Sequence, residues 1–371
     1  MKLVTATEAD SSRLKEFFAR MSLPGAIDYS IERQGNFFDQ YRVLSDQFET
    51  YMLEDDKGEI NGMASLIFKE GFVLGEKQTW AFATDLRISP SRRAIAQWSQ
   101  YFLPVLERAR EERRCRYVFS AVEQHDNQAY NALIRPTSHA RRRLPRYLLA
   151  NRFRWITLHA RVPFAHKPLK AIRLKEADLN DVEPLSAYLR DRAKARPLAD
   201  LHTPESLVNI EKRWPGLKLS DFRVAYDSSG NVRGCSALWD GRHVQHLIPQ
   251  GYNGFQQTLH QTLSVASLTG LVRPTPKLGQ VSPTRFLTHL SCDSAEIFHR
   301  LVDEAYSRLG SRELLSYVHF RGNWRTLPPT SFMATTIPYG LYLLLPPSAE
   351  APPWPTPSMQ SLPPEFELAW L

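Results

Sequence analysis

The feature that most restricts how this 371-residue chain folds is an internal repeat with the period of a whole domain. The tripeptide Glu8-Ala9-Asp10 returns 168 residues later as Glu176-Ala177-Asp178, and each copy follows an apolar start. In both places the aspartate can cap a helix, and apolar residues then recur at helical spacing. These apolar residues are Leu14, Phe17 and Phe18 in the first copy, and Val182, Leu185 and Leu189 in the second. Each copy is therefore predicted to begin with a strand and a capped helix.

A second match extends the repeat. The segment EDDKGEINGMASL (54–66) and the segment YDSSGNVRGCSAL (226–238) share the frame Asp-x-x-Gly-x-(Ile/Val)-x-Gly. Gly58 and Gly230 supply the positive backbone angle of a hairpin turn, and the alternating residues after them build the returning strand. The offset is now 172, four residues from the first offset. We interpret the two collinear matches as a duplicated domain.

The repeat sets the domain boundaries. The junction falls within residues 161–171, which predicts one domain over residues 1–165, a second over residues 166–345 and a tail over residues 346–371. The length also favours two domains, because a single core rarely grows to this size. The tail holds eight prolines in 26 residues, which favours an extended segment with no core of its own. Its aromatic residues are expected to dock onto the second domain, and binding to a partner is the alternative.

The order of elements after each hairpin is similar in the two copies. The first copy is predicted to contain a strand, a long helix, a strand, a short helix and a last strand, at Trp80–Ile88, Ile95–Arg114, Cys115–Val122, Asn127–Ile134 and Tyr147–Val162. The second is predicted to contain a strand, a helix, a strand and a terminal strand, at Phe286–Leu290, Ala295–Leu309, Leu314–Phe320 and Ile337–Leu345. Each copy is therefore mixed α/β.

The positive charge is concentrated in the middle of the chain. Residues 87–170 carry 18 Lys and Arg against 5 Asp and Glu, although the whole chain has a net charge of only +8. Such a field favours a polyanionic partner, and a solvated arginine-rich face is the alternative. The three cysteines lie far apart without metal-binding spacing, and neither a signal peptide nor a membrane span is evident, so a cytoplasmic protein without a metal is expected.

The order of elements resembles that of the GNAT (GCN5-related N-acetyltransferase) superfamily. The resemblance rests on EADSSRLKEF, EDDKGEINGMASL, DLRISPSRRAIAQWSQYF and VEQHDNQAYNAL, and it is more continuous over the first 160 residues than over residues 171–345. It implies two tandem GNAT-like domains, each a mostly antiparallel mixed sheet flanked by helices. It also implies transfer of an acyl group, most simply acetyl, from acetyl-CoA or another acyl-CoA to an amine.

The resemblance further implies where coenzyme A binds. In the family the fourth strand binds the pantetheine arm, and the turn after it presents N–H groups to the pyrophosphate at a helix N-terminus. The residues expected there are Leu86, Arg87, Ile88, Ser91, Arg92, Arg93, Ala94, Ile95 and Ala96, and Asn127 is expected to contact the cofactor. A gapless alignment of the family's glycine pattern places Ala96 and Trp98 at its glycine positions, whereas a shorter alignment uses Ala94 and Ala96. Neither alignment restores a glycine, and the arginines can partly compensate.

The catalytic candidates also come from the resemblance. The family uses a carboxylate on the fourth or fifth strand as base, which points to Asp85 and Glu123. Its acid is often a tyrosine on the next helix, which points to Tyr130, with Tyr147 as a later candidate. The family's tyrosine position itself falls at Leu133 or Ile134.

An arginine-rich segment, residues 135–155, replaces the short turn usual in the family. The cluster Arg141, Arg142, Arg143 and Arg146 is a candidate site for an anionic nucleotide, which makes a GNAT-like sensor without catalysis the alternative function. Nucleic-acid binding ranks lower, because no known nucleic-acid module accompanies the arginines. The second copy carries Asp293 and Glu296 at its own turn, so it is expected not to bind coenzyme A in the usual way.

Overall fold

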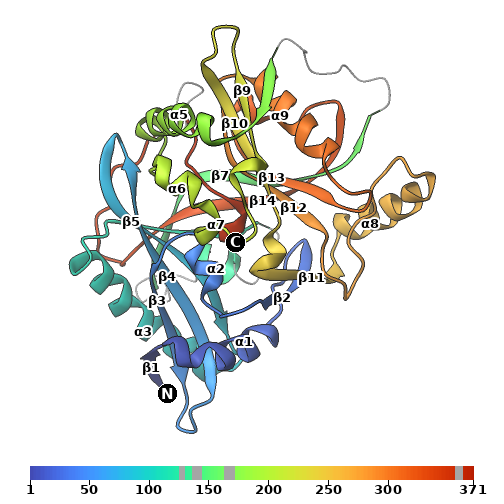
Figure 1. The fold of residues 1–371 in the computed structure, drawn as a ribbon. Coiled ribbons are helices and arrows are strands. Elements are labelled where there is room, and N and C mark those ends of the chain that lie inside the picture. Colours follow the sequence, from blue (N-terminus) through green and yellow to red (C-terminus); the bar gives the residue numbers. More distant parts are fainter. Residues whose placement is uncertain (125–129, 136–143, 163–171, 356–361) are drawn as a thin grey trace.

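The computed structural model describes residues 1–124, 130–135, 144–162, 172–355 and 362–371 (Figure 1). Its strands form a 12-stranded sheet and a separate two-stranded sheet, with helices on both faces of the larger one. The mixed α/β class expected from the sequence is confirmed. Among these residues, no helix is both long enough and apolar enough to cross a membrane.

The first half of the chain supplies the elements from the N-terminus to the long seventh strand. In chain order they are β1 (Lys2–Thr5), α1 (Ser11–Ala19), β2 (Ile27–Arg33), α2 (Asp39–Arg42), β3 (Gln47–Glu54), β4 (Ile60–Val73), β5 (Glu76–Ile88), α3 (Arg92–Glu111), β6 (Tyr117–Glu123), a short π-helix (Tyr130–Ile134) and β7 (Arg146–Arg161).

The second half has a similar order, but it has no strand in the place of β2 and it contains an additional strand and helix. Its elements are β8 (Arg173–Glu176), α5 (Val182–Ala195), α6 (Pro204–Val208), α7 (Ile210–Arg213), β9 (Phe222–Tyr226), β10 (Val232–Trp239), β11 (Gln245–Tyr252), α8 (Phe255–Ala266), β12 (Thr284–Cys292), α9 (Ala295–Ser307), β13 (Leu314–Phe320), β14 (Phe332–Leu345) and a 3-10 turn (Leu368–Trp370). The pair β11 and α8 is the inserted segment.

The large sheet is continuous through both halves because their last strands are exchanged. Its order is β1-β3-β4-β5-β6-β14-β7-β13-β12-β10-β9-β8. The strand β14 pairs with β6 of the first half, and β7 pairs with β13 of the second half. The two exchanged strands then pair with each other along almost their whole length at the centre (Figure 1). Each half of the sheet is therefore completed by a strand from the other half.

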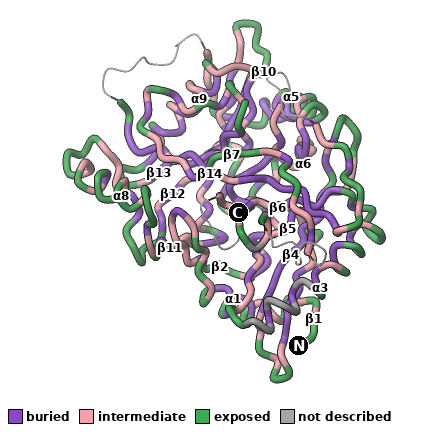
Figure 2. The backbone as a smooth tube through the Cα atoms, turned by 180° about the vertical axis from the view of Figure 1, so that it is seen from behind, coloured by how far each residue is buried: buried purple, intermediate pink, exposed green. Residues whose placement is uncertain are grey.

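Each face of the sheet has its own core. One face buries apolar side chains of α1, α2, α5 and β2 in a single cluster that spans both halves. The opposite face carries two separate clusters, one under α3 and one under α9. Figure 2 shows from behind how burial follows the strands between these layers. The small sheet, in which β2 pairs with β11, joins the halves on the first face.

The two halves share strand and hairpin geometry, but one of the two sequence matches is out of register. The strand pairings Lys2 with Glu54 and Arg173 with Tyr226 make β1 and β8 equivalent at an offset of 171. At this offset Asp10 corresponds to Asp181, and each carboxylate accepts a hydrogen bond from the backbone N–H three residues earlier. The two Glu-Ala-Asp sequences are thus three residues apart in the structural alignment, and the predicted equivalence of Asp10 with Asp178 was wrong.

The hairpin match holds residue for residue. Gly58 has φ +80° and Gly230 has φ +83°. Each amide donates to the carbonyl three residues earlier, at Asp55 or Asp227, with distances of 3.1 Å in both turns. The turns therefore have the same geometry.

The tail packs against the sheet on the face that carries α1 and α2. Trp354 lies against Phe119 with the ring centroids 4.9 Å apart, and Trp370 lies 6.0 Å from Trp80. Phe366 contacts both Phe82 of the first half and Phe153 of the exchanged strand β7. The tail therefore docks onto the sheet as expected, but its aromatic residues contact rings of residues 1–165 and not those of the second domain that the sequence suggested.

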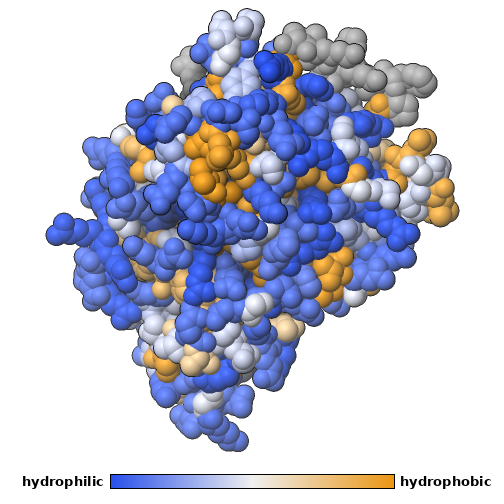
Figure 3. All heavy atoms as spheres, viewed as in Figure 1, coloured by the Kyte–Doolittle hydropathy of each residue, from blue (hydrophilic) through white to orange (hydrophobic). Residues whose placement is uncertain are grey.

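The surface in the view of Figure 1 is mostly hydrophilic, and Figure 3 shows hydrophobic side chains gathered around the end of α8. Val265, Leu268 and Leu271 in this region are exposed.

Candidate active site

Two neighbouring strands separate in the middle of the first half. The strands β5 and β6 run parallel and pair only over Trp80–Phe82 and Tyr117–Phe119. Beyond that point β5 is irregular, since its register with β4 shifts between Met63 and Ser65, and Asp85 has φ +56°. A bulge of this kind redirects the backbone and side chains next to it. The divergence therefore opens the sheet where Asp85 and Glu123 stand.

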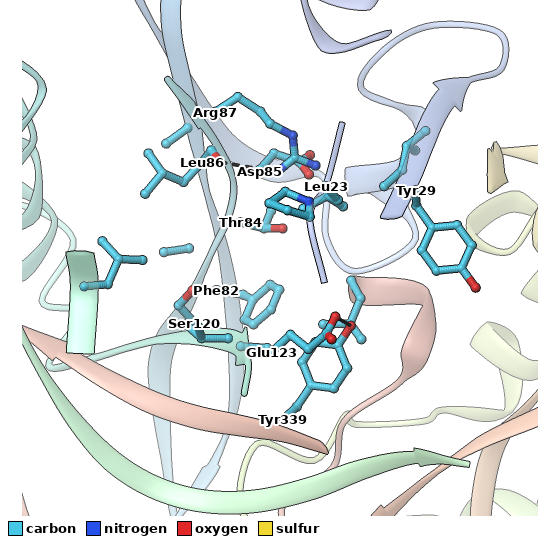
Figure 4. A pocket seen from close by; sticks show the side chains of 18 of the residues that line it. Leu23, Tyr29, Phe82, Thr84, Asp85, Leu86, Arg87, Ser120, Glu123 and Tyr339 are labelled. Atoms are coloured by element: carbon cyan, nitrogen blue, oxygen red, sulfur yellow. Dashed lines mark hydrogen bonds between the residues drawn. The ribbon is translucent and has the colours of Figure 1, made fainter. Parts of the chain in front are cut away.

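A cavity of about 210 Å³ occupies this opening. Figure 4 shows side chains of β5, β6, β14 and β2 around it. Its lining falls into two groups, one on each face of the sheet. On the α3 face lie Ala64, Ala83, Leu86, Phe102, Val122, Leu133, Tyr147 and Leu344, and on the α1 face lie residues that include Leu23, Ile27, Tyr29, Ile31, Phe82, Asp85, Arg87, Glu123, Trp155, Leu247, Tyr339, Leu368 and Leu371. The cavity thus passes through the sheet.

The carboxylate of Asp85 is held by two buried partners. Arg33 of β2 donates to it at 2.6 Å, and the hydroxyl of Tyr41 donates at 2.8 Å. The side chains of Arg33 and Asp85 are only 2% and 4% exposed. Separating such a pair would leave an uncompensated buried charge, which is costly. Asp85 is therefore at the site but engaged in an ion pair.

Glu123 is the last residue of β6 and reaches into the cavity from the α1 face. Its Oε1 accepts a hydrogen bond from the backbone N–H of Ala26 at 2.5 Å, and the hydroxyl of Tyr339 lies 3.4 Å from its Oε2. A Cβ at Gly25 would lie 2.4 Å from the same carboxylate, so glycine is needed for this close approach. The segment before β2 therefore positions Glu123.

The tyrosines are arranged differently from the expectation. Tyr130 starts the short π-helix and stacks on Arg135, with 5.2 Å from the guanidinium to the ring centroid, and it does not line the described part of the cavity. Leu133, at the family's tyrosine position, does line it, as do Tyr147 and Tyr339. Burial raises the pKa of Tyr147, so its phenol stays protonated at neutral pH.

The expected phosphate turn leads into the N-terminus of α3. Ser91 caps this helix, and its hydroxyl accepts the backbone N–H of Ala94 at 3.0 Å. Leu86 and Arg87 line the cavity just before the turn, and Arg87 also lies over the ring of Phe18. The strand ends at Ile88, whose side chain packs toward the α3 cluster. The side chains of Arg92, Arg93, Ile95 and Ala96, and the whole of Asn127, lie outside the described part of the chain.

The arginine-rich segment is described only in part. Arg141, Arg142 and Arg143 lie outside the described residues. Arg146 lies in β7 and donates to the carbonyl of Ala349 in the tail, which is a structural contact. Nothing described in this segment supports a nucleotide site.

The second half has an equivalent opening that the chain itself fills. His289 matches Asp85 in position and has φ +51°, and β12 pairs in parallel with β13 over three residues before the strands separate. In this opening the N–H of His289 donates to Glu367 at 2.7 Å, and Arg196 donates to the carbonyl of Leu290 at 3.1 Å. Asp293, in the acidic turn, forms ion pairs with Arg192 and Arg233. The tail and these ion pairs occupy the place that a ligand would need.

This arrangement defines the class of fold. No protein-family model matches the chain, and no curated protein sequence does. The chain has the GNAT fold, since solved structures with this fold align over 92–93% of it. The resemblance noted in the sequence is confirmed at the level of the fold.

Two of these structures illustrate the likeness. A GCN5-related N-acetyltransferase from Sphaerobacter thermophilus is 10% identical, with a TM-score of 0.51, over 92% of this chain and 95% of its own. The N-myristoyltransferase of Saccharomyces cerevisiae, solved with bound myristoyl-CoA, is 9% identical, with a TM-score of 0.55, over 93% of this chain and 82% of its own.

Several cavity residues could not be found from the sequence. Tyr29, which lines the cavity, and Arg33, which binds Asp85, carry no motif, and Tyr339 belongs to the exchanged strand β14, which is 216 residues from Glu123. The pattern indicated only that each of these segments was a strand or was apolar. No group of His, Cys, Asp and Glu side chains in the described chain has an arrangement able to hold a metal ion.

Proposed function

We propose that this chain transfers an acyl group, most simply acetyl, from acyl-CoA to an amine. The observation that carries the proposal is the cavity that passes through the sheet where β5 and β6 diverge. Such an opening lets two substrates meet from opposite faces, which acyl transfer requires. Coenzyme A approaches from the α3 face, and the amine approaches from the α1 face.

The N-terminus of α3 and the end of β5 are the proposed coenzyme A site. Free N–H groups at a helix N-terminus favour phosphate, and β5 beyond Phe82 has backbone groups that no longer pair with β6. The proposed contacts are those expected from the sequence, namely Leu86, Arg87, Ile88, Ser91, Arg92, Arg93, Ala94, Ile95, Ala96 and Asn127. The free, buried cysteines fit a cytoplasmic setting.

The chemistry assigns Glu123 as the base. The amine nitrogen attacks the thioester carbon, a C–N bond forms, the C–S bond breaks, and the amine proton passes to the Glu123 carboxylate. Tyr147, which lines the cavity on the α3 face, donates a proton to the departing sulfur and regains one from solvent. Tyr130 is not retained as the acid, because its ring lies against Arg135. Asp85 holds Arg33 and Tyr41 in place rather than acting as a base.

The tandem organisation is part of the proposal. Residues 1–165 form the GNAT-like domain that binds acyl-CoA, and residues 166–345 form a second domain that has lost this ability. The matched hairpins, the matched positive φ of Asp85 and His289, and the order of the sheet support a duplication. The tail, residues 346–371, supports the proposal that the second domain no longer binds acyl-CoA, because Glu367 fills the second opening.

The test combines binding with turnover. We expect acetyl-CoA to raise the melting temperature of the full chain, as any ligand of the native state must, and to release free thiol in the presence of an amine panel. Replacement of Glu123 by Gln should lower kcat/KM at least 100-fold, which is the usual size of a lost general base, and should leave the stabilisation by acetyl-CoA unchanged.

The matched control is Glu350→Gln, which makes the same chemical change at an exposed residue of the tail and should keep full activity. Absence of both stabilisation and thiol release would overturn the proposed function. Full activity of the Glu123→Gln enzyme would remove Glu123 as the base.

A further inference from the structure

Most of the side chains at the end of the cavity that receives the amine are apolar or aromatic. On the α1 face, Tyr29 of β2 and Trp155 of β7 stack with their centroids 6.3 Å apart and their planes 3° from parallel. Ile27, Ile31 and Leu247, which come from β2 and β11, line the cavity beside them. The small sheet therefore forms an apolar roof over this end. The whole cavity, over both faces of the sheet, has a volume of about 210 Å³, which is larger than the roughly 150 Å³ that holds benzene in an apolar protein interior.

The stacked pair closes the far end of this space. A second cavity of about 30 Å³ shares Tyr29 and Trp155 as walls, and its lining is more polar, with Thr157, His159 and Thr335. A volume of that size has room for about one water molecule. The body of the acceptor therefore ends at Tyr29 and Trp155 and does not extend beyond them.

Three charged side chains line this end, the carboxylates of Glu123 and Asp85 and the guanidinium of Arg87. Glu123 lies close enough to Tyr29 for its charge to help raise the pKa of that phenol, although burial is the larger cause. The other carboxylate of the lining, Asp85, is already bound by Arg33 and Tyr41. A polycation would need further carboxylates to replace its hydration, and burying its extra charges here would be costly.

We propose that the acceptor is an apolar monoamine with a body the size of an aromatic ring. Its amine nitrogen lies at Glu123, and its ring lies against Tyr29 and Trp155, under Ile27 and Leu247. This assignment rests on the proposed function, since it names the substrate class of the same site. Burial of the ring supplies the binding free energy, and the carboxylate fixes the orientation of the nitrogen.

The experiment compares acceptors on the full chain. With acetyl-CoA fixed, 2-phenylethylamine should give a kcat/KM at least tenfold above that of spermidine or lysine. Tyr29→Ala should raise the KM for 2-phenylethylamine at least tenfold and keep the thermal stabilisation by acetyl-CoA. Ile27→Ala, a smaller change in the same roof, should raise this KM less, which keeps the test valid if the first variant folds poorly.

Trp324→Ala is the matched control, since it removes an exposed aromatic ring of the second half and should leave this KM unchanged. Faster turnover of spermidine or lysine, with acetyl-CoA still bound, would overturn the acceptor class and leave acyl transfer standing. Absence of stabilisation by acetyl-CoA and of thiol release with every amine would instead overturn the proposed function. If acetyl-CoA binds without turnover, failure of 2-phenylethylamine to stabilise the protein would also overturn the acceptor class.

Discussion

Glu367 shows, at the scale of a single residue, how the tail is held in the second half. Its side chain is buried and accepts the backbone N–H of His289 at 2.7 Å. Burial raises the pKa of this carboxyl to about 8, and the nearby charge of Glu365 adds to the effect, whereas the His289 N–H, Arg196 and Lys69 oppose it. The folded chain therefore keeps a proton on Glu367 where an unfolded chain has released it.

This proton makes stability depend on pH. The ordinary pKa of a glutamate here is 4.5, so between pH 4.5 and about 8 the folded state binds more protons than the unfolded state. Stability from this group is complete below pH 4.5 and is lost as the pH rises through the folded value. We expect the free energy of unfolding, measured by urea denaturation, to fall less steeply over this range in Glu367→Gln than in the unchanged chain.

The comparison of the two chains isolates Glu367 from the buried histidines. Burial lowers the pKa of His159 to about 4 and lowers that of His289, so these groups make stability rise with pH in the acidic range. Both chains keep these histidines, so the part of their contribution that does not depend on Glu367 cancels in the difference. A difference in unfolding free energy that does not change with pH would contradict the assignment.

The residues of the site show where sequence reasoning reached its limit. The family resemblance pointed to Asp85 and Glu123 as candidate bases, and the structure places both in the cavity lining. The state of Asp85 was not predictable, because its partner Arg33 lies 52 residues away on β2, a strand without a motif. The strand that carries a side chain determines where that side chain lies, but its ion pair also depends on the element that carries the partner.

At the scale of elements, the two hairpins offer a direct test of the repeat. A Cβ at Gly58 or at Gly230 would meet no atom within 4 Å, so only the backbone conformation resists a side chain there. We expect Gly58→Ala and Gly230→Ala each to lower the free energy of unfolding by about 1–2 kcal/mol, the cost of a left-handed conformation for an L-residue. Chemical denaturation of the two variants measures this.

The control for these variants is Gly310→Ala, because Gly310 has no positive φ and a Cβ there would come no closer than 3.5 Å to Glu313. It should change the free energy of unfolding by less than about 0.5 kcal/mol. Clearly unequal costs at Gly58 and Gly230 would show that the two turns are not equivalent in energy.

The elements with strong local signals were predicted well. The strand Leu314–Phe320 has its predicted bounds, and the helix predicted over Ile95–Arg114 lies at Arg92–Glu111. The three-residue error at the start of the repeat arose because the identical Glu-Ala-Asp sequences were aligned with each other. The equivalent positions are set instead by strand pairing, such as that of β1 with β3. The small sheet was missed, since the strand that pairs with β2 is β11, more than 200 residues away.

At the scale of the whole molecule, the exchange of β7 and β14 links the halves. Tyr339 and Phe153 pair across the two exchanged strands and stack with centroids 5.3 Å apart. In the pairing of β14 with β6, Tyr339 lies opposite Glu123. In the pairing of β7 with β13, Phe153 lies opposite Phe320. The sequence could not reveal this, because either strand satisfies the pattern of a last strand in either half.

The exchange has a consequence for folding. In a fragment of residues 1–165, the edge of β6 from Phe119 to Glu123 would lose β14, and β7 would lose the neighbours on both of its sides, β13 and β14. An unpaired edge in the middle of a sheet exposes backbone groups and apolar surface, which favours aggregation. The cavity would also lose Tyr339 and Leu344.

We therefore expect the fragment of residues 1–165 to show no cooperative unfolding by itself, and co-expression with residues 166–371 to restore a single transition and the stabilisation by acetyl-CoA. Calorimetry of each fragment and of the complex measures this. Closure of the isolated half by its own β7, placed beside β6 in the position of β14, is the competing outcome. If the fragment unfolds cooperatively at a melting temperature near that of the full chain, this closure is established. The two halves would then fold as separate units, and the exchange of β7 and β14 would not be needed for stability.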